Sequence, residues 1–487
     1  MSQPAPKLQI SRVELHGIYV QGEEAVMALV EGLLERIGQL EERIEALENQ
    51  GKKDSRNSSK PPSSDGFGKR NQSLRQKSER PSGGQTGHPG STLEWRAEAD
   101  HIFVHPVGDC QECGTNLSEG DVERFECRQV HDLPPLRLEV SEHQAEVKIC
   151  PHCHWETRAA FPADVNSVVQ YGAGVKGLMV YLLEGQLLPS ARVCELMSEV
   201  FACELSEGTL YNARDRCFET LAPVELSVKA ALQAAEVVHF DETGMRVKGQ
   251  LFWLHVACTR GLTYYFMHPK RGTAAMDEMD ILPHFQGISV HDGFSSYAQY
   301  DCEHSACNAH HLRDLIFILE RYQQPWAQEM MDLLREGKHQ VEEAIISAPT
   351  LTPQVLTELE ARYQAILKQG LEINPPPPPP ETTKKKGRKA QTPAKNLLDR
   401  LQSQRQQVLR FLYDFRVPFD NNQAERDIRM VKLKQKISGG FRSQAGAQQF
   451  SRIRGYLSTM RKQGQKLLNV LRQVFLGQPV LPSLQPE

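Results

Sequence analysis

The sequence lacks the two kinds of hydrophobic segment that direct a chain to or across a membrane. No stretch of its 487 residues approaches 18 consecutive apolar residues, and the N-terminus has no basic segment followed by an apolar one. The first absence excludes a membrane-spanning helix and the second a secretory signal. We therefore predict a cytoplasmic protein with no membrane partner. A chain of this length is too long for one compact core and predicts three to five folded units.

The sequence also lacks the paired cysteines of a secreted disulfide framework, since its 11 cysteines are an odd number. Four of them form two Cys-x2-Cys pairs, Cys110 with Cys113 and Cys150 with Cys153. Two such pairs can supply four thiolates to one tetrahedral, structural Zn²⁺. Alternating segments at 137–140 and 146–149 are suited to the strands of a ribbon. We predict a zinc-binding ribbon over residues 100–165; four buried, inert cysteines are the alternative.

The individual zinc ligands are less defined than the site, because the 36 residues between the two pairs exceed the common zinc-ribbon spacing. Nearby side chains offer substitutes, namely Cys127, His105, His131, His152 and His154.

The net charge of −4 is small, but charges of opposite sign are segregated along the chain. Residues 51–90 contain nine Lys and Arg against three acids, and residues 426–472 contain twelve against one. This pattern is expected of a protein with phosphate-binding surfaces. A solvated helix face is the alternative for the C-terminal run.

A heptad pattern near the N-terminus predicts a coiled-coil dimerisation helix over residues 22–50. The apolar positions alternate at spacings of three and four, and they are Val30, Leu33, Ile37, Leu40, Ile44 and Leu47. β-Branched residues at one position with Leu at the other favour a parallel homodimer. The alternative is an amphipathic helix packed on its own chain. Residues 51–95 then change to Lys, Arg, Ser, Asn, Pro and Gly, which predicts a disordered basic linker.

Residues 170–225 predict helices, two of which resemble a helix-turn-helix. Ser190 and Ser206 are suited to cap helices over 191–201 and 207–221. The second helix would offer Arg214 and Arg216 to DNA. Plain helical packing is the alternative.

The centre of the chain places carboxylates after short apolar segments. Residues 237–240 predict a buried strand ending at Asp241, residues 251–259 and 262–268 predict a hairpin, and residues 287–291 predict a strand ending at Asp292. Glu425 follows much later, on the first turn of a helix capped by Asp420 or Asn421. Each residue alone could be an ordinary surface acid. Together they would repel one another unless divalent cations neutralise them.

Three sequence motifs carry a resemblance to a known family. They are Phe240–Thr243 (FDET), His291–Tyr297 (HDGFSSY) and Asp420–Arg429 (DNNQAERDIR). They resemble motifs of bacterial insertion-sequence transposases of the Insertion Sequence 66 family, and the resemblance covers most of the chain. It implies that Asp241, Asp292 and Glu425 are the DDE triad of an RNase H-like fold, holding two Mg²⁺, or Mn²⁺, per active site.

The resemblance extends to residues beside the triad. Cys307-x2-His310 resembles a CxxH signature that supports the active site in several DDE transposase groups, and we assign the same supporting role to Asn421 and Asn422. One alternative is a second metal site built from Cys302, His304, Cys307 and His310. The other is that the histidine is an ordinary buried core residue.

The 133 residues between Asp292 and Glu425 exceed what the catalytic core needs and predict an insertion. We predict catalytic core over 232–300, a helical insertion over 301–415, and a second part of the core with basic helices over 416–476. The insertion contains a stiff Pro-rich and basic tether at 374–395. The residues that we predict to contact DNA are Arg214, Arg216, Arg426, Arg429, Lys432, Lys434, Lys436 and Arg442.

The fold class that follows is multidomain α/β: an RNase H-like domain interrupted by a helical insertion, with an N-terminal coiled coil and a zinc-ribbon-like domain. The expected function is metal-dependent cleavage and strand transfer at an insertion sequence's terminal inverted repeats. The expected partners are transposon-end and target DNA, a second copy of the chain and accessory proteins of the same element, at the bacterial nucleoid. The alternatives are a non-catalytic zinc-ribbon and coiled-coil regulator that binds DNA, and a host nuclease without strand transfer.

Overall fold

The computed structural model describes residues 10–54, 56–58, 93–134, 136–376 and 391–484. The chain divides into two compact units. One contains residues 225–432 with residues 1–74 and the last five, and the other contains residues 75–224 and 433–482. Most of the predicted linker (59–92) and of the predicted tether (377–390) lies outside the described residues.

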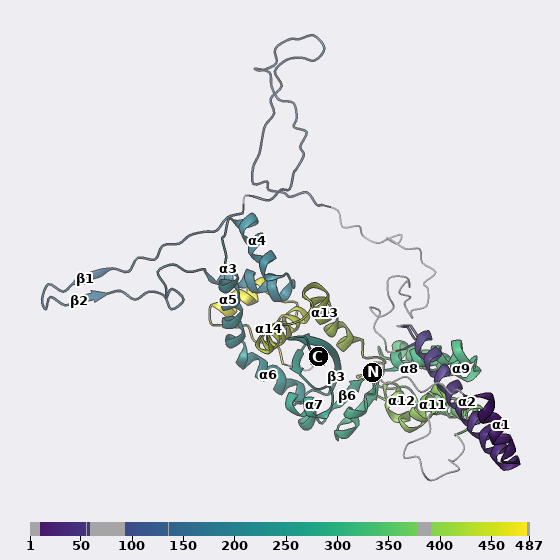
Figure 1. The fold of residues 1–487 in the computed structure, drawn as a ribbon. Helices are drawn as coiled ribbons and strands as arrows, with labels where there is room; N and C mark the ends of the chain where they lie inside the picture. Colours follow the sequence, from purple (N-terminus) through teal and green to yellow (C-terminus); the bar gives the residue numbers. More distant parts are fainter. Residues whose placement is uncertain (1–9, 55, 59–92, 135, 377–390, 485–487) are drawn as a thin grey trace. The chain divides into compact units, whose positions relative to one another are not determined.

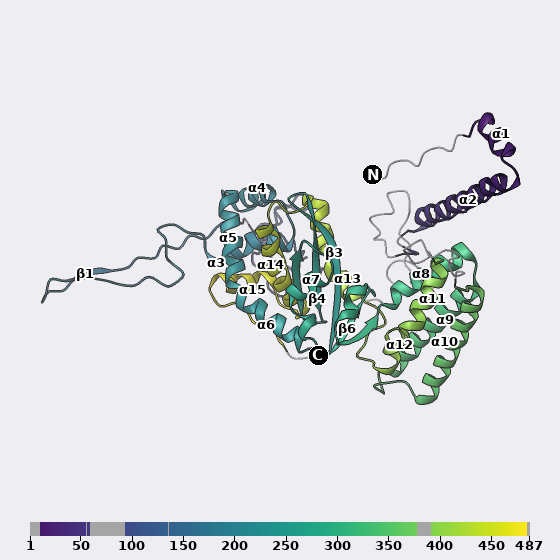
Figure 2. The ribbon, with the colours of Figure 1, turned by 60° about the horizontal axis from the view of Figure 1, so that its bottom comes forward.

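A five-stranded mixed sheet forms the core of the first unit (Figures 1 and 2). Its strands are β3 (Val237–Val247), β4 (Gln250–Cys258), β5 (Thr263–His268), β6 (Ile288–His291) and β7 (Glu303–Ala306). The order across the sheet is β5-β4-β3-β6-β7. β3, β4 and β5 pair antiparallel, whereas β6 pairs parallel with β3 and β7 parallel with β6.

β3 is longer than the sequence predicts, because it continues into a tight hairpin with β4. Lys248 and Gly249 form the turn with φ values of 52° and 76°, the left-handed conformations that two-residue hairpins require. Asp241 therefore lies inside β3, opposite Val256 of β4, and the prediction that it ends the strand is wrong. β6 pairs with β3 only as far as His239, so Asp241 comes just after the end of this parallel pairing.

Helices cover this sheet and close its core. The segments are α6 (Ala222–Gln233), α7 (Thr273–Met279), η3 (Leu282–His284) and η4 (Ser295–Gln299). Leu232 of α6 and Met276 of α7 pack in one buried cluster with Val238 and Phe240 of β3. At Gly287, just before β6, an added Cβ would lie 2.5 Å from the Ala235 carbonyl oxygen, so this close approach requires glycine.

Among the described residues, five helices form the insertion between β7 and the Glu425 helix. They are α8 (Asn308–Tyr322), α9 (Pro325–Ala344), α10 (Pro353–Ile373), α11 (Pro393–Ser403) and α12 (Arg405–Tyr413). Their core includes the fully buried Trp326, Tyr363 and Phe411. The chain then enters α13 (Asn422–Ser438).

Helices from distant parts of the sequence share the core of the second unit. They are α3 (Ala173–Val180), the π-helix η2 (Tyr181–Gly185), α4 (Ser190–Phe201), α5 (Glu207–Thr220), α14 (Gln444–Lys462) and α15 (Leu467–Phe475). Met179, Leu210, Ile453 and Leu471 pack in one buried cluster. The two helices of the predicted helix-turn-helix are present as α4 and α5, and α5 contributes its apolar face to this cluster.

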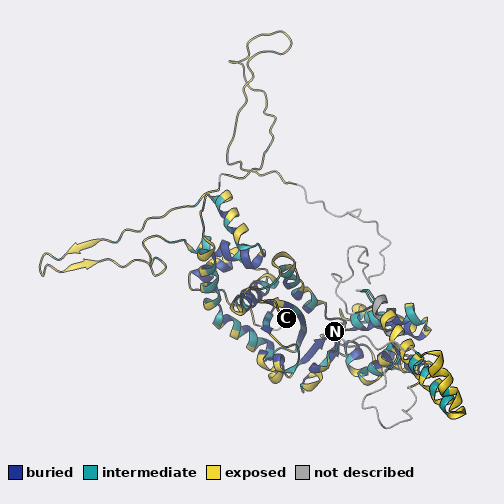
Figure 3. Ribbon diagram, viewed as in Figure 1, coloured by how far each residue is buried: buried dark blue, intermediate teal, exposed yellow. Residues whose placement is uncertain are grey.

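The cysteine-containing segment and the N-terminal helices bury little surface (Figure 3). β1 (Val147–Ile149) and β2 (Glu156–Arg158) form a short antiparallel hairpin, and segment 137–140 is not a strand. α1 (Arg12–Val20) begins with a capping box of Ser11 and Glu14. In α2 (Glu23–Lys52), most apolar heptad side chains are exposed.

Candidate active site

The structure brings Asp241, Asp292 and Glu425 within electrostatic reach of one another in the first unit. Burial first, and then the nearby carboxylates of Glu242, Asp292 and Glu425, raise the pKa of Asp241 well above its usual value. Asp292 directly follows β6, and Glu425 lies on the first turn of α13. Side chains separated by 51 and 133 residues in the sequence thus come together in one acidic cluster, in which the ligating oxygens of the three acids do not all lie within 4.8 Å of one another.

Asp292 and Glu425 keep part of their surface open to solvent. The Asp292 side chain is 23% exposed and that of Glu425 is 26% exposed. The backbone N–H of Phe294 donates to Asp292 Oδ1 at 2.9 Å, which fixes one carboxylate oxygen. The two Glu425 oxygens lie 3.9 Å from His310 Nε2 and 3.7 Å from Arg313 Nη2. These contacts are long and leave both oxygens available to another ligand.

Asn421 ties the start of α13 to the central strand. Its side chain is buried; the amide Nδ2 donates to the Phe240 carbonyl at 2.7 Å, and its Oδ1 lies 2.8 Å from His239 Nδ1. Its backbone N–H donates to Cys307 Sγ at 3.1 Å. Asn421 therefore fixes the turn that carries Glu425 against the strand that carries Asp241. Asn422 is exposed.

The CxxH motif lies beside Glu425. Ligating atoms of Cys307, His310 and Glu425 all lie within 4.8 Å of one another. Burial raises the pKa of Cys307 to about 12, so its sulfur is a neutral thiol that accepts from Asn421. His310 Nδ1 is buried and has no hydrogen-bond partner among the described residues. Cys302 and His304 bond instead to Ser289.

Three further side chains, which the sequence does not single out, lie beside the acids: Glu242, Arg271 and Tyr297. Glu242 is fully enclosed; Arg271 donates to its Oε1 at 2.7 Å, and the Tyr297 hydroxyl donates to its Oε2 at 2.8 Å. Arg271 Nη2 also lies 3.8 Å from Asp292 Oδ2. Glu242 belongs to the FDET motif, which was a usable signal, whereas no pattern marks Arg271.

The donor set of this cluster fits Mg²⁺ or Mn²⁺. Hard carboxylate oxygens from Asp241, Asp292 and Glu425 are the ligands that these cations prefer. Burial is the largest cause of the raised pKa of Asp241, and repulsion from Glu242, Asp292 and Glu425 adds to it. A bound cation would remove that repulsion. Glu242 already accepts from two partners and is the acid least suited to bind metal.

The predicted DNA-binding residues have different surroundings. In the first unit, Arg426 and Arg429 are exposed, while Lys432 donates to the Gly244 carbonyl at 3.0 Å. In the second unit, Arg216, Lys436 and Arg442 are exposed and Lys434 is half-buried. Arg214 is only 18% exposed and stacks on Tyr211 at 4.7 Å.

Part of the C-terminal basic charge serves packing within the second unit. Arg452 stacks on Phe218 at 3.7 Å, and the buried Arg454 donates to the carbonyls of Glu184 and Gly185. These two arginines stabilise the helical core.

The two Cys-x2-Cys pairs form turns with the same hydrogen bonds. Gly114 N–H donates to the Cys110 carbonyl at 2.9 Å, and His154 N–H donates to that of Cys150 at 2.8 Å. The first cysteine of each pair donates to the residue five positions later, Thr115 or Trp155. Hydrogen bonds from Thr115 lower the pKa of Cys113 to about 7. Among the described residues, no three of the four cysteines are close enough to hold one ion.

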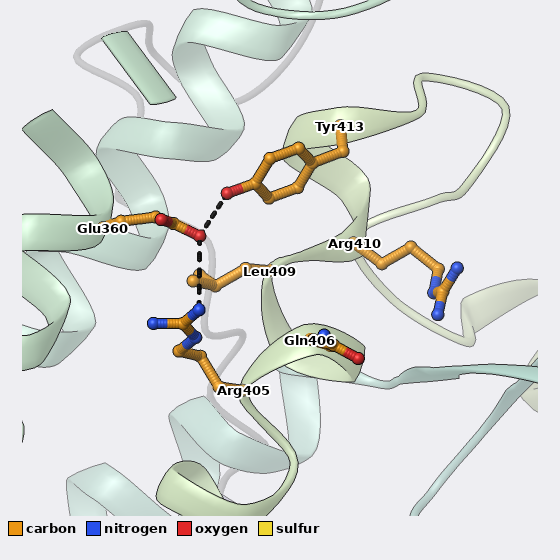
Figure 4. A pocket seen from close by; sticks show the side chains of 6 residues that line it. All are labelled: Glu360, Arg405, Gln406, Leu409, Arg410 and Tyr413. Atoms are coloured by element: carbon orange, nitrogen blue, oxygen red, sulfur yellow. Dashed lines mark hydrogen bonds and ion pairs between the residues drawn. The ribbon is translucent and has the colours of Figure 1, made fainter. Parts of the chain in front are cut away.

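A pocket in the helical insertion contains none of the predicted site residues (Figure 4). It is lined by Glu360, Arg405, Gln406, Leu409, Arg410 and Tyr413. Glu360 accepts from the Tyr413 hydroxyl and lies 3.8 Å from Arg405, whereas Arg410 pairs with Glu303 outside the pocket. Each charged side chain of the pocket is therefore near a group of opposite charge, inside or outside the pocket.

Comparison with known families identifies the class of protein. A family model of transposases matches residues 169–449, which is more than half of the chain and includes all three acids. The match indicates an enzyme that acts on DNA. The chain belongs to the Transposase IS66 family, which confirms the family predicted from the motifs.

A second family model matches the N-terminal part of the chain. It covers residues 14–94 and is described as a family of unknown function (DUF6444). Curated proteins give no match to the chain. Within the described ranges, no helix is both long and apolar enough to cross a membrane.

Proposed function

We propose that this transposase cuts and joins DNA at a DDE centre formed by Asp241, Asp292 and Glu425, with an insertion sequence's terminal inverted repeats as its substrate. The observation that supports this most is geometric: Asp241 lies in β3, Asp292 directly follows the parallel neighbour of β3, and Asn421 fixes the start of the Glu425 helix against β3. The centre is also partly open to solvent at Asp292 and Glu425, as a site for a polymeric substrate must be.

The sheet order supports an RNase H-like core. In chain order, the strands are arranged 3-2-1-4-5, with the first three antiparallel and the last two parallel to the first. Asp241 comes from the central strand and Asp292 from the end of its parallel neighbour. The two aspartates are thus held by rigid backbone, and Glu425 is added from α13.

The chain's own residues would work as follows. Asp241, Asp292 and Glu425 would hold two Mg²⁺, or Mn²⁺, which supply an activated nucleophile and stabilise the leaving oxygen in phosphoryl transfer. Asn421 positions the turn before Glu425. Arg429 and Lys432 follow Glu425 by four and seven residues, so they share its side of α13 and attract the DNA backbone.

We further propose that the two cysteine turns bind one structural Zn²⁺. They present matched geometry, and thiols with lowered pKa at Cys113 and Cys150 favour metal binding. Large apolar side chains in this segment are exposed, including Phe103 and Val130, so metal would supply the organisation that a core does not. Metal analysis should find one zinc per chain, lost in Cys110→Ser.

The proposed reaction is tested with labelled DNA carrying the ends of the insertion sequence. The intact protein should cut this DNA in Mg²⁺ and join the released ends, and Asp241→Asn should bind the DNA without cutting it. If both proteins bind and neither cuts, even with accessory proteins of the same element, the chain is a DNA-binding regulator. Cutting without joined products would indicate a nuclease.

A further inference from the structure

Arg271 is a cation fixed at the edge of the acidic cluster. It lies between β5 and α7, and its Nε and Nη2 contact Glu242 Oε1 at 2.7 and 2.6 Å. Glu242 is completely enclosed, and Tyr297 donates to its other oxygen. A buried carboxylate, itself fixed by a hydrogen bond from Tyr297, thus holds the Nε and Nη2 side of the guanidinium.

Two aromatic rings further restrict the guanidinium. Its central carbon lies 4.1 Å from the ring centre of Phe294 and 5.1 Å from that of Trp253. Cation–π contacts at these distances favour a single orientation of the group. Trp253 comes from β4, whereas Phe294 follows Asp292 by two residues, so separate parts of the chain converge on Arg271.

The contacts with Glu242 use only some of the N–H donors of Arg271. A guanidinium carries five N–H donors, and within the described chain no hydrogen bond is found for Nη1. The side chain is also 37% exposed. Nη2 lies 3.8 Å from Asp292 Oδ2, too far for a hydrogen bond. A group that binds beside Asp292 would therefore meet a preoriented arginine with free donors.

We propose that Arg271 binds a non-bridging oxygen of the DNA phosphodiester that is cut or joined at this centre. This inference rests on the proposed function, which supplies the phosphodiester. Arginine matches phosphate through its planar fork of donors. Glu242, Phe294, Trp253 and Tyr297 are positioning residues for it. Arg271 would then be a catalytic residue in addition to the three acids.

The test measures DNA binding with Ca²⁺ in place of Mg²⁺. Two DNAs are compared, one native and one with a neutral methylphosphonate at the position that the wild-type protein cuts. Wild type should prefer the native DNA, and Arg271→Ala should reduce this preference about tenfold, as expected for the loss of one charged hydrogen bond. Arg260→Ala, which removes an exposed arginine from the turn between β4 and β5, should keep the wild-type preference.

A second variant covers the case in which Arg271→Ala does not fold. Glu242→Gln keeps Arg271 but removes the charge that holds it, and it should also reduce the preference for native DNA. Unchanged preference in a folded Arg271→Ala, or in Glu242→Gln if only that variant folds, would overturn the inference.

A cleavage assay in Mg²⁺ distinguishes failure of the inference about Arg271 from failure of the proposed function. If wild type cuts DNA while Arg271→Ala keeps its full preference, only the inference is wrong. If wild type does not cut, the proposed function fails and the inference fails with it.

Discussion

Asn421 is the side chain on which the position of Glu425 depends. It is buried and bonds to β3 at both its amide nitrogen and its amide oxygen. We predict that Asn421→Ala lowers the free energy of unfolding by roughly 1–3 kcal/mol, because it removes buried hydrogen bonds to β3. Urea denaturation measures this change.

The matched control is Asn422→Ala, which removes the same side chain from an exposed position one residue later. Its effect should stay within about 0.5 kcal/mol, as is usual for surface substitutions. Equal losses in the two variants would contradict the role of Asn421.

The raised pKa of Asp241 predicts that the stability of the metal-free protein decreases as pH rises. Its pKa is raised in the folded protein, so the folded state binds more protons than the unfolded chain above the ordinary Asp pKa of about 3.9. Stability of the metal-free protein must then fall as pH rises from that value to the folded pKa, and stay lower above it. Replacing the carboxyl by an amide removes this penalty.

Metal-free Asp241→Asn should therefore melt above metal-free wild type at neutral pH, by about 2–4 °C for each kcal/mol recovered. The difference should vanish below about pH 4. Thermal melts in EDTA across pH 3.5–8 check both statements. A lower melting temperature for the variant at pH 7 would show that Asp241 is not strained by its acidic neighbours.

At the residue scale, the sequence identifies acids better than their partners. Asp241, Asp292 and Glu425 stand in motifs; Asp292 directly follows β6, Glu425 lies on the first turn of α13, and Asp241 lies inside β3. Glu242 is adjacent to Asp241, and adjacent side chains on a strand point to opposite faces of the sheet. The sequence therefore does not predict that Glu242 lies in the same site as Asp241. Arg271 reaches the cluster from a loop whose course depends on tertiary packing.

At the scale of elements, α2 carries an apolar seam that the single chain leaves exposed. Ile37 is 50% exposed and Leu40 is 53% exposed. We propose that a second copy covers this seam in a parallel coiled coil. Ile37→Asp should then weaken dimerisation at least about 100-fold, because two buried isoleucines, each worth roughly 1.5–3 kcal/mol, are lost per dimer.

Light scattering after gel filtration measures this change in mass. Gln39→Asp is the matched control, because it adds the same charge to the same helix outside the seam. A wild-type monomer, or an Ile37→Asp protein that remains as dimeric as Gln39→Asp, would contradict the coiled coil.

Long, periodic helices follow the sequence closely, whereas short elements do not. The sequence predicts α4 and α5 to within one residue at each end, and it overlooks α6 and β7. β7 has the sequence Glu-His-Ser-Ala, which is too short and polar to show strand periodicity. It becomes a strand because β6 supplies a parallel edge.

At the scale of the whole molecule, folding gathers what the sequence separates. The three acids proposed as catalytic come from both sides of an insertion with its own core, and the second unit joins helices on both sides of the sheet-forming segment. Charge segregation predicts a phosphate-binding surface, and basic residues such as Arg426 and Arg442 are exposed, as such a surface requires. It does not predict that Arg454 is buried, because composition does not distinguish a phosphate contact from a helix-packing arginine.

The proposed reaction requires the three acids to form one cation site. Mn²⁺ has a free-ion paramagnetic resonance signal that is lost on binding, so titration gives its affinity for wild type, Asp241→Asn, Asp292→Asn and Glu425→Gln. Asp301→Asn, at an exposed acid near the site in sequence, is the control. We predict that each of the three substitutions weakens Mn²⁺ binding by about tenfold or more, ~1.4 kcal/mol, and that the control does not. Wild-type affinity in any one of the three would contradict a shared site.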